Sequence, residues 1–238
     1  MNIFRFIGDM SHTASILVLL LKLRASKSAA GVSLKTQELW LVVFVARYLD
    51  LFEHFISLYN SVMKVLYTTL TSLIIYMIRQ QTPYKATYDK SQDSFLHWKF
   101  AVAPCSAFAF IVHLWNRWGH GLFGFRGILN YFWVFSEVLE PLAILPQLMV
   151  LQRYREVENL TGESSPPVLS AGWHYVFLLG VYRVMYILNW VWRAYHETGY
   201  QHHILLYIAG LVQTLLYTDF FYYYAISKYY GGRMSLPA

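Results

Sequence analysis

Long apolar runs, each closed by a short polar stretch, repeat along the whole 238-residue chain. About 20 consecutive apolar residues in a helix are enough to cross the hydrocarbon core of a bilayer. The pattern therefore predicts seven membrane-spanning helices, at residues 2–21, 36–53, 57–78, 96–115, 126–151, 172–193 and 203–227. The expected fold class is an all-α polytopic membrane protein.

The composition supports a membrane protein and argues against several other classes. Hydrophobic residues make up 57% of the chain and charged residues only 13%, whereas soluble domains carry about 25% charged residues. The formal net charge of +6 comes mostly from short connections, where membrane topology explains it without a nucleic-acid partner. The chain has a single cysteine, Cys105, and no nucleophile, phosphate-loop, dinucleotide or metal-ligand motif. We therefore expect a protein that is not an enzyme and has no cofactor or metal site.

Basic residues are unevenly distributed among the connections, which predicts the orientation in the membrane. They follow the first, third, fifth and seventh predicted spans: Lys22, Arg24, Lys27, Lys35, Arg79, Lys85, Lys90, Arg153, Arg155, Lys228 and Arg233. Connections rich in Lys and Arg stay in the cytosol. We therefore expect a lumenal N-terminus and a cytosolic C-terminus.

The second predicted span carries two full charges, at Arg47 and Asp50. An ionisable side chain at mid-membrane costs about 2.5–3.5 kcal/mol on insertion scales, so it should face protein or a water-filled cavity. Spacing i, i+3 places the two side chains on one helix face. One interpretation is a structural ion pair between them. The other, which we favour because further intramembrane arginines follow, is a functional site.

Further ionisable and aromatic residues lie within or beside the predicted spans. Arg5, Arg47, Arg183 and Arg193 stand against Asp9, Asp50, Glu137, Glu140 and Asp219, and the two sets could simply neutralise each other. A row of guanidinium groups is also what a carboxylate-rich ligand requires, because arginine grips carboxylates with a planar fork. Hydroxyl donors and flat walls are available nearby from Tyr48, Tyr182, Tyr186, Trp133 and Trp190.

His12 is the only side chain of the first span that titrates near neutral pH. It is either a structural group or a switch between pH 5 and 8.

A weak internal repeat relates the second and sixth spans. Val45-Ala46-Arg47-Tyr48 resembles Val181-Tyr182-Arg183-Val184, each with an arginine inside an apolar helix. This suggests two three-helix repeats around a linker helix, with a cavity between the halves. The single transmembrane domain would comprise repeat one at about 1–78, the linker at about 96–115, repeat two at about 126–227 and a tail at 228–238.

Several blocks of sequence resemble the KDEL receptor family, the ER lumen protein retaining receptors. They include Met1-Asn2-Ile3-Phe4-Arg5-Phe6, Ala46-Arg47-Tyr48-Leu49-Asp50-Leu51-Phe52, Ala143-Ile144-Leu145-Pro146-Gln147-Leu148, Asn189-Trp190-Val191-Trp192-Arg193 and Asp219-Phe220-Phe221-Tyr222. The blocks lie in the family's order over nearly the whole length. The resemblance implies seven helices in the plan of the SWEET and PQ-loop transporters. It also implies a multi-pass receptor of the ER and cis-Golgi, which binds C-terminal Lys/His-Asp-Glu-Leu signals in the acidic Golgi and releases them in the neutral ER.

The resemblance also implies roles for individual residues. Arg47 and Tyr48 would hold the terminal carboxylate of the signal, with Tyr186 as a further ligand residue. The acidic side chains of the signal would meet Arg5, Arg193 and Trp190, and its first, cationic residue would lie near Asp50 and Trp133. The pH-sensing group would be His12 with Tyr182, Glu140 and Asp219.

The chain departs from the family pattern at three places, one of which is the greater length of the connections at 115–128 and 159–172. Asn130 stands where a family glutamate would meet the cation of the signal. The tail lacks the paired lysines that the family exposes to COPI, so coat binding through the tail, by COPI or COPII, would rest on Lys228 or Arg233. The alternative function is a small-solute transporter of the PQ-loop or SWEET type.

Overall fold

The structure, a computed structural model, describes residues 2–53, 55–117, 124–161 and 167–230. Every secondary-structure element in these ranges is helical, which confirms the predicted fold class. The longer helices are α1 (Ile3–Ser26), α2 (Leu34–Arg47), α3 (Leu58–Gln80), α5 (Ala103–Arg117), α6 (Phe125–Leu139), α7 (Leu145–Thr161), α8 (Pro167–His196) and α9 (Ile204–Tyr230). Short elements join them: α4 (Tyr84–Thr87), the 3-10 helices η1 (Tyr48–Phe52) and η3 (Glu140–Leu142), and the π-helix η2 (Trp98–Val102).

Within the described ranges, six helical segments are long and apolar enough to cross a membrane: Ile3–Ser26, Leu58–Gln80, Trp98–Trp115, Phe125–Tyr154, Gly172–His196 and Ile204–Tyr222. The predicted span at 36–53 differs, because α2 has only 14 residues. At about 1.5 Å per residue α2 is about 21 Å long, and the five residues of η1 add about 10 Å. Together they approach the thickness of about 30 Å of a bilayer core.

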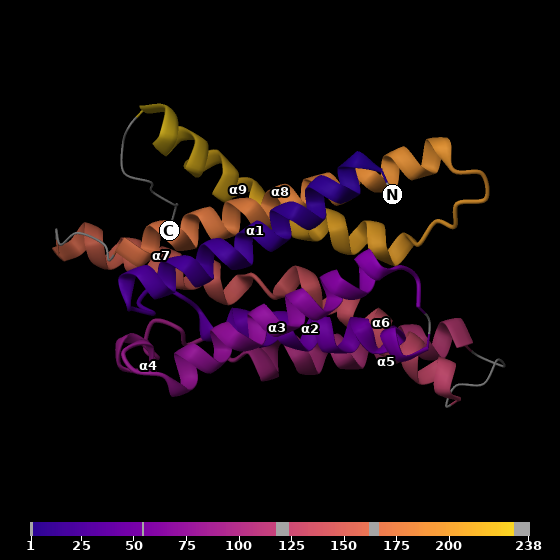
Figure 1. The fold of residues 1–238 in the computed structure, drawn as a ribbon, viewed down its shortest axis with the longest axis horizontal. Helices are drawn as coiled ribbons and strands as arrows, with labels where there is room; N and C mark the ends of the chain where they lie inside the picture. The colour runs from indigo at the N-terminus through magenta and orange to yellow at the C-terminus, as the bar shows by residue number, and fades with distance from the viewer. Residues whose placement is uncertain (1, 54, 118–123, 162–166, 231–238) are drawn as a thin grey trace.

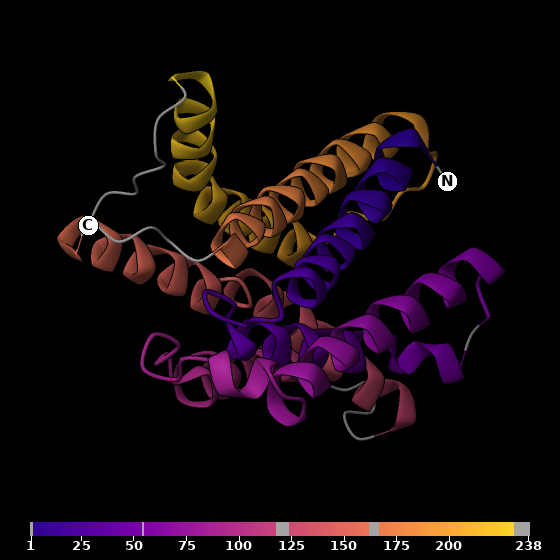
Figure 2. The same ribbon diagram turned by 60° about the vertical axis from the view of Figure 1, so that its left-hand side comes forward.

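The long helices form two layers (Figures 1 and 2). One layer holds α9, α8 and α1, and α1 runs against α8 along much of its length. The other holds α3, α2, α6 and α5, with α2 lying between α3 and α6. Helices from the two ends of the chain are therefore neighbours, and the site described below draws on both.

Two glycines allow α8 to pack closely on its neighbours. A Cβ atom on Gly8 of α1 would lie 2.8 Å from Cδ2 of Tyr186, and one on Gly180 would lie 2.2 Å from Cζ of Phe221 in α9. Small residues at such crossings let membrane helices approach each other until their backbones are near contact. The α1–α8–α9 layer depends on these positions.

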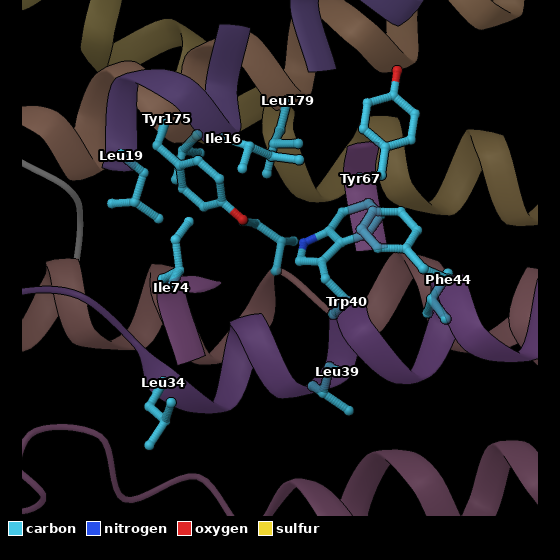
Figure 3. Packing of buried hydrophobic residues seen from close by; sticks show 14 of the residues in the cluster. Ile16, Leu19, Leu34, Leu39, Trp40, Phe44, Tyr67, Ile74, Tyr175 and Leu179 are labelled. Carbon is cyan, nitrogen blue, oxygen red and sulfur yellow. The ribbon is translucent and has the colours of Figure 1, made fainter. Parts of the chain in front are cut away.

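Away from the site described below, the interior between the layers is largely apolar, and much of the outer surface is apolar as well. Figure 3 shows Ile16, Trp40 and Ile74 among the buried side chains that α1, α2 and α3 direct toward one another. On the outside, large apolar side chains such as Leu21 and Leu215 are exposed. An apolar exterior is unfavourable in water and suits contact with lipid tails, as expected for a polytopic membrane protein.

The end of the molecule remote from the N-terminus is held together by a hydrogen-bond network centred on Gln147. Its Oε1 accepts from the backbone N–H of Ser33 at 2.8 Å, and its Nε2 donates to the carbonyl of Gly31 at 2.8 Å. The backbone N–H of Gln147 donates to Oγ1 of Thr36, and Ser33 Oγ donates to Asp93, both at 2.9 Å. The network ties the start of α2 to α7 and to the segment before α5.

Candidate functional site

The two layers enclose a cavity of about 310 Å³ near the end that carries the N-terminus. Nine of the predicted site residues line it together: Arg5, His12, Arg47, Tyr48, Asp50, Trp133, Tyr182, Tyr186 and Trp190. They come from α1, α2, η1, α6 and α8. Residues far apart in the sequence thus meet at one concave surface, as a ligand site requires.

Arg47 is the last residue of α2 and lies across the cavity from α1. All three of its guanidinium nitrogens contact acceptors on α6 and η3. Nε donates to Oγ of Ser136 at 3.1 Å, Nη2 lies 3.2 Å from Oε1 of Glu137, and Nη1 pairs with Oε2 of Glu140. The guanidinium is therefore positioned as a fixed fork, with Nε and Nη1 hydrogen-bonded and Nη2 held, among the residues that the structure describes, only by its ion pair with Glu137.

Glu140 lies immediately behind the cavity wall and is fully buried. Besides Arg47, it accepts a hydrogen bond from the hydroxyl of Tyr182 at 2.8 Å and one from Nη1 of Arg183 at 3.2 Å. The guanidinium of Arg183 also lies over the ring of Trp190, 5.1 Å from its centroid. Two cations and a hydroxyl compensate this one carboxylate, as a buried charge requires.

Asp9 connects three helices on the opposite wall. Its Oδ2 accepts from the hydroxyl of Tyr59 in α3 at 2.8 Å, and its Oδ1 accepts from Tyr186 in α8 at 2.6 Å. The backbone carbonyl of Asp9 accepts from Tyr67 at 2.9 Å. Arg5 is its closest cation, with 3.9 Å between Nε and Oδ2. The side chain of Asp9 is only 7% exposed, so these contacts define its position.

His12 is buried one turn beyond Asp9 and is surrounded by aromatic rings. Its ring centroid lies 5.0 Å from that of Trp40, 4.7 Å from that of Tyr67 and 4.5 Å from that of Tyr182. It is one of the cavity-lining residues. The ring therefore meets the cavity and, through Tyr182, the group around Glu140.

Asp50 pairs with a residue that the sequence analysis did not single out. Lys64 Nζ lies 2.7 and 2.8 Å from the two carboxylate oxygens of Asp50, and 5.5 Å from the ring centroid of Tyr48. The alternative in which Arg47 and Asp50 pair with each other is wrong. The chain changes from α2 to η1 between them, so that Arg47 reaches carboxylates on α6 and η3 while Asp50 reaches an ammonium on α3.

Arg193 lies outside the main cavity, in an adjoining one of about 400 Å³ that shares Trp190 and Leu206 with it. Its Nε is 2.7 Å from Oε2 of Glu197, and its guanidinium lies 4.7 Å from the ring centroid of Tyr200. Burial and a hydrogen bond with Tyr207 raise the pKa of Tyr200 to about 12. Tyr200 is therefore a neutral wall beside Arg193 at physiological pH.

The remaining predicted residues lie in different surroundings. Trp133 lines the cavity and meets the ring of His203 edge to face at 5.6 Å. Asn130 is two turns from Glu137 on α6; its Nδ2 lies 3.4 Å from Nδ1 of His113, and it does not line the cavity. The side chain of Asp219 lies outside the described part of the structure.

Four charged residues that line the cavity had no role in the predicted site: Asp9, Lys64, Glu137 and Arg183. Lys64 had a usable signal, as the one charged residue within the predicted span 57–78. Glu137 and Glu140 are spaced i, i+3, which puts both on one helix face. Within the described ranges, no group of three His, Cys, Asp or Glu side chains could hold a metal ion.

Comparison with known proteins identifies the family. A sequence model described as the ER lumen protein retaining receptor matches residues 28–193. The chain is similar to an ER lumen protein-retaining receptor of Petunia hybrida, with 49% identity over 238 residues and full coverage of both chains. It is 48% identical to receptor B of Arabidopsis thaliana and 42% identical to receptor 2 of Gallus gallus, again with full coverage of both chains. The chain thus belongs to the ER lumen protein retaining receptors, a family of receptors and not of enzymes.

Proposed function

We propose that the protein is a Golgi-to-ER retrieval receptor that binds C-terminal Lys/His-Asp-Glu-Leu signals at acidic pH and releases them at neutral pH. The observation that carries the proposal is the cavity in which Arg5, Arg47 and Arg183 converge, with Arg193 in the adjoining cavity. Such a signal carries three carboxylates, two on side chains and one at the C-terminus. Arginine forks are the groups best suited to hold them.

Each part of the signal has a candidate partner. Arg47, with Tyr48, would take the terminal carboxylate, because its side chain is 20% exposed at the cavity whereas that of Arg183 is 2% exposed and pairs with Glu140. Arg5 and Arg193, which lie nearer the helix ends, would take the acidic side chains, with Trp190 between the two cavities as a flat wall. Asp50 would meet the cationic first residue, sharing its charge with Lys64.

The charges that line the cavity support acid-favoured binding. Arg5, Arg47, Lys64 and Arg183 line it, and Asp9, Asp50 and Glu137 line it with Glu140 directly behind, so cations and anions are nearly balanced. A signal ending in Lys-Asp-Glu-Leu brings a net charge of about −2 from its ionised groups. An incoming proton compensates this charge, and His12 beside Tyr182 is a suitable acceptor. Affinity would then fall as the pH rises.

The proposed orientation follows from the position of the cavity. It lies at the end that carries the N-terminus, whereas the basic connections after α1 and α3 lie at the other end. With the basic end in the cytosol, the cavity faces the lumen of the ER and cis-Golgi. We further propose the two-repeat plan, with 1–78 and 126–227 around a linker at 96–115, and contact with coat components through the tail at 228–238. The transporter alternative is not favoured, because the relatives reported above are named receptors.

Peptide binding to purified protein tests the proposal. A labelled peptide ending in Lys-Asp-Glu-Leu is titrated at about pH 5.4 and about pH 7.4, beside the same peptide with an amidated C-terminus. We expect binding at the acidic pH, weaker binding at neutral pH, and none after amidation, because amidation removes the charge that Arg47 would hold. Equal binding of the amidated peptide would refute the role of Arg47, and no binding at either pH would refute the receptor proposal for this chain.

A further inference from the structure

Glu137 is placed so that a second carboxylate could displace it from Arg47. It lines the cavity and its side chain is only 5% exposed. Its Oε1 lies 3.2 Å from Nη2 of Arg47, while Oε2 is buried without a hydrogen-bond partner among the described residues. A buried carboxylate normally has all its oxygens satisfied. The unsatisfied oxygen marks Glu137 as held by a single contact.

The other carboxylate on Arg47 is held differently. Glu140 does not line the cavity, and it keeps Tyr182 and Arg183 as partners in addition to Arg47. A ligand carboxylate that reaches Arg47 from the cavity therefore meets Glu137 first. Nε and Nη1 of Arg47 already donate to Ser136 and Glu140, so the ligand carboxylate must approach Nη2, which makes no hydrogen bond to the described residues but lies 3.2 Å from Oε1 of Glu137.

We propose that Glu137 is an internal competitor for Arg47: it forms an ion pair with Nη2 of the guanidinium and is displaced, with uptake of one proton, when a terminal carboxylate binds. This inference rests on the proposed function. The ligand class that it concerns is a peptide with a free C-terminal carboxylate. The proton comes from the lumenal solution and is released again when the Arg47–Glu137 pair re-forms on ligand departure.

Proton uptake follows from the charges that face Glu137. Once displaced, its carboxylate would be close to the ligand carboxylate and to Glu140, so three carboxylates would share Arg47 and Arg183, both of which already form ion pairs with Glu140. Two carboxylates that share one buried site do not both remain ionised. The other charged or titratable groups that line the cavity carry their own contacts: Arg5 with Asp9, Lys64 with Asp50, His12 within its ring cluster, and the hydroxyls of Tyr182 and Tyr186. From α9, the described lining residue is the neutral Leu206.

The sign of the effect agrees with retrieval. At acidic pH the displaced carboxyl is readily protonated, so the competitor is weak and the ligand stays bound. As the pH rises the carboxylate regains its charge, recovers Arg47 and expels the ligand. Glu137 thereby adds a proton-linked step to the one proposed for His12, and it acts directly on the group that holds the C-terminus.

Glu137→Gln tests the inference, because the amide keeps the size of the side chain and cannot carry the charge. Binding of the Lys-Asp-Glu-Leu peptide is measured between about pH 5.4 and pH 7.4. One coupled proton changes affinity about tenfold per pH unit. We therefore expect the slope of log Kd against pH to fall by about one, with tighter binding at neutral pH. Calorimetry in two buffers of different ionisation enthalpy should count about one proton fewer per peptide bound.

The matched control is Glu38→Gln, which neutralises another carboxylate paired with a guanidinium. Glu38 contacts Arg79 at 2.5 Å and His97 at 3.1 Å, away from the cavity. The slope of log Kd against pH for Glu38→Gln should equal that of the wild type. If Glu137→Gln does not fold, Glu137→Met removes the charge at similar volume and is measured in the same way.

The outcomes separate the two proposals. Wild-type protein that binds no peptide at either pH refutes the proposed function itself. A wild-type protein with acid-favoured binding, beside a Glu137→Gln variant of unchanged slope and proton count, refutes only the competitor. Weaker binding by Glu137→Gln at neutral pH would also overturn it, since Glu137 would then support Arg47 in holding the ligand.

Discussion

Asp9 holds three helices together through its acceptors, so the change of Asp9 to Asn should destabilise the fold measurably. The two side-chain contacts, from Tyr59 at 2.8 Å and from Tyr186 at 2.6 Å, go to different oxygens of one ionised carboxylate. Asparagine keeps one carbonyl oxygen and replaces the other with an NH₂ group, which cannot accept a hydrogen bond. One tyrosine therefore loses its acceptor, and the other keeps a weaker, neutral one.

The change in the free energy of unfolding combines the weakening of two hydrogen bonds with the removal of a buried charge. Hydrogen bonds to charged groups contribute about 1.5–3 kcal/mol and neutral ones about 0.5–1.5 kcal/mol, so losing one and weakening the other costs about 3 kcal/mol. Removal of a carboxylate whose side chain is only 7% exposed, with its nearest cation 3.9 Å away, offsets part of this cost. We expect a net loss of about 2 kcal/mol. For a chain of this size, that lowers the melting temperature by about 4–8 °C.

Thermal unfolding of purified protein in detergent, followed by tryptophan fluorescence, measures the effect. Asp89→Asn is the control, because Asp89 is exposed and contacts only its own loop. Hydrogen bonds from Ser91 hold the pKa of Asp89 below its usual range, and no helix depends on it. Tyr59→Phe and Tyr186→Phe should each cause a smaller fall than Asp9→Asn. A melting temperature for Asp9→Asn within about 1 °C of the control would refute the reasoning.

Three further predictions concern the cavity and the helix packing. His12→Ala should flatten the pH dependence of peptide binding, and an unchanged ratio of affinities at acidic and neutral pH would remove His12 from the mechanism. Gly180→Ala should lower the melting temperature by several degrees, because the new Cβ would lie 2.2 Å from a ring of α9, whereas Gly124→Ala, with nothing within 4 Å, should not. Asp50→Asn should weaken a peptide with a cationic first residue severalfold more than one with a neutral first residue, as the carboxylate that Lys64 shares is removed; equal losses for both peptides would contradict its role.

Hydropathy predicted the fold class and most of the spans because the length of each apolar run can be read from the sequence alone. It did not reveal that the second span is two elements, since the apolar run continues unbroken through the change from α2 to η1 at Arg47. Nor did it show that the span at 126–151 is interrupted by η3, although Pro141 lies there and cannot donate a backbone hydrogen bond. Helix breaks of this kind depend on tertiary contacts.

The sequence indicated many of the residues that line the cavity, but it did not indicate which acidic and basic residues form ion pairs there. The types and spacing of Arg5, Arg47 and Trp190 indicated groups that face protein, and the structure brings them to one cavity. Which carboxylate meets which guanidinium depends on helix rotation and on contacts across more than 80 positions in the chain, as between Arg47 and Glu137. Such distances are not visible in a local pattern.

The two ends of the molecule are held by contacts of different kinds, and this determines where it can yield. Around Gln147, short neutral hydrogen bonds to backbone groups tie α2 and α7 together, and no charged ligand can substitute for them. Around Arg47, the same helix is held by ion pairs, and an incoming carboxylate would replace the one with Glu137 that faces the cavity. We therefore expect the helix ends near Gln147 to stay fixed and act as a hinge. Exchange of the carboxylate paired with Arg47 would shift the helix ends near the cavity.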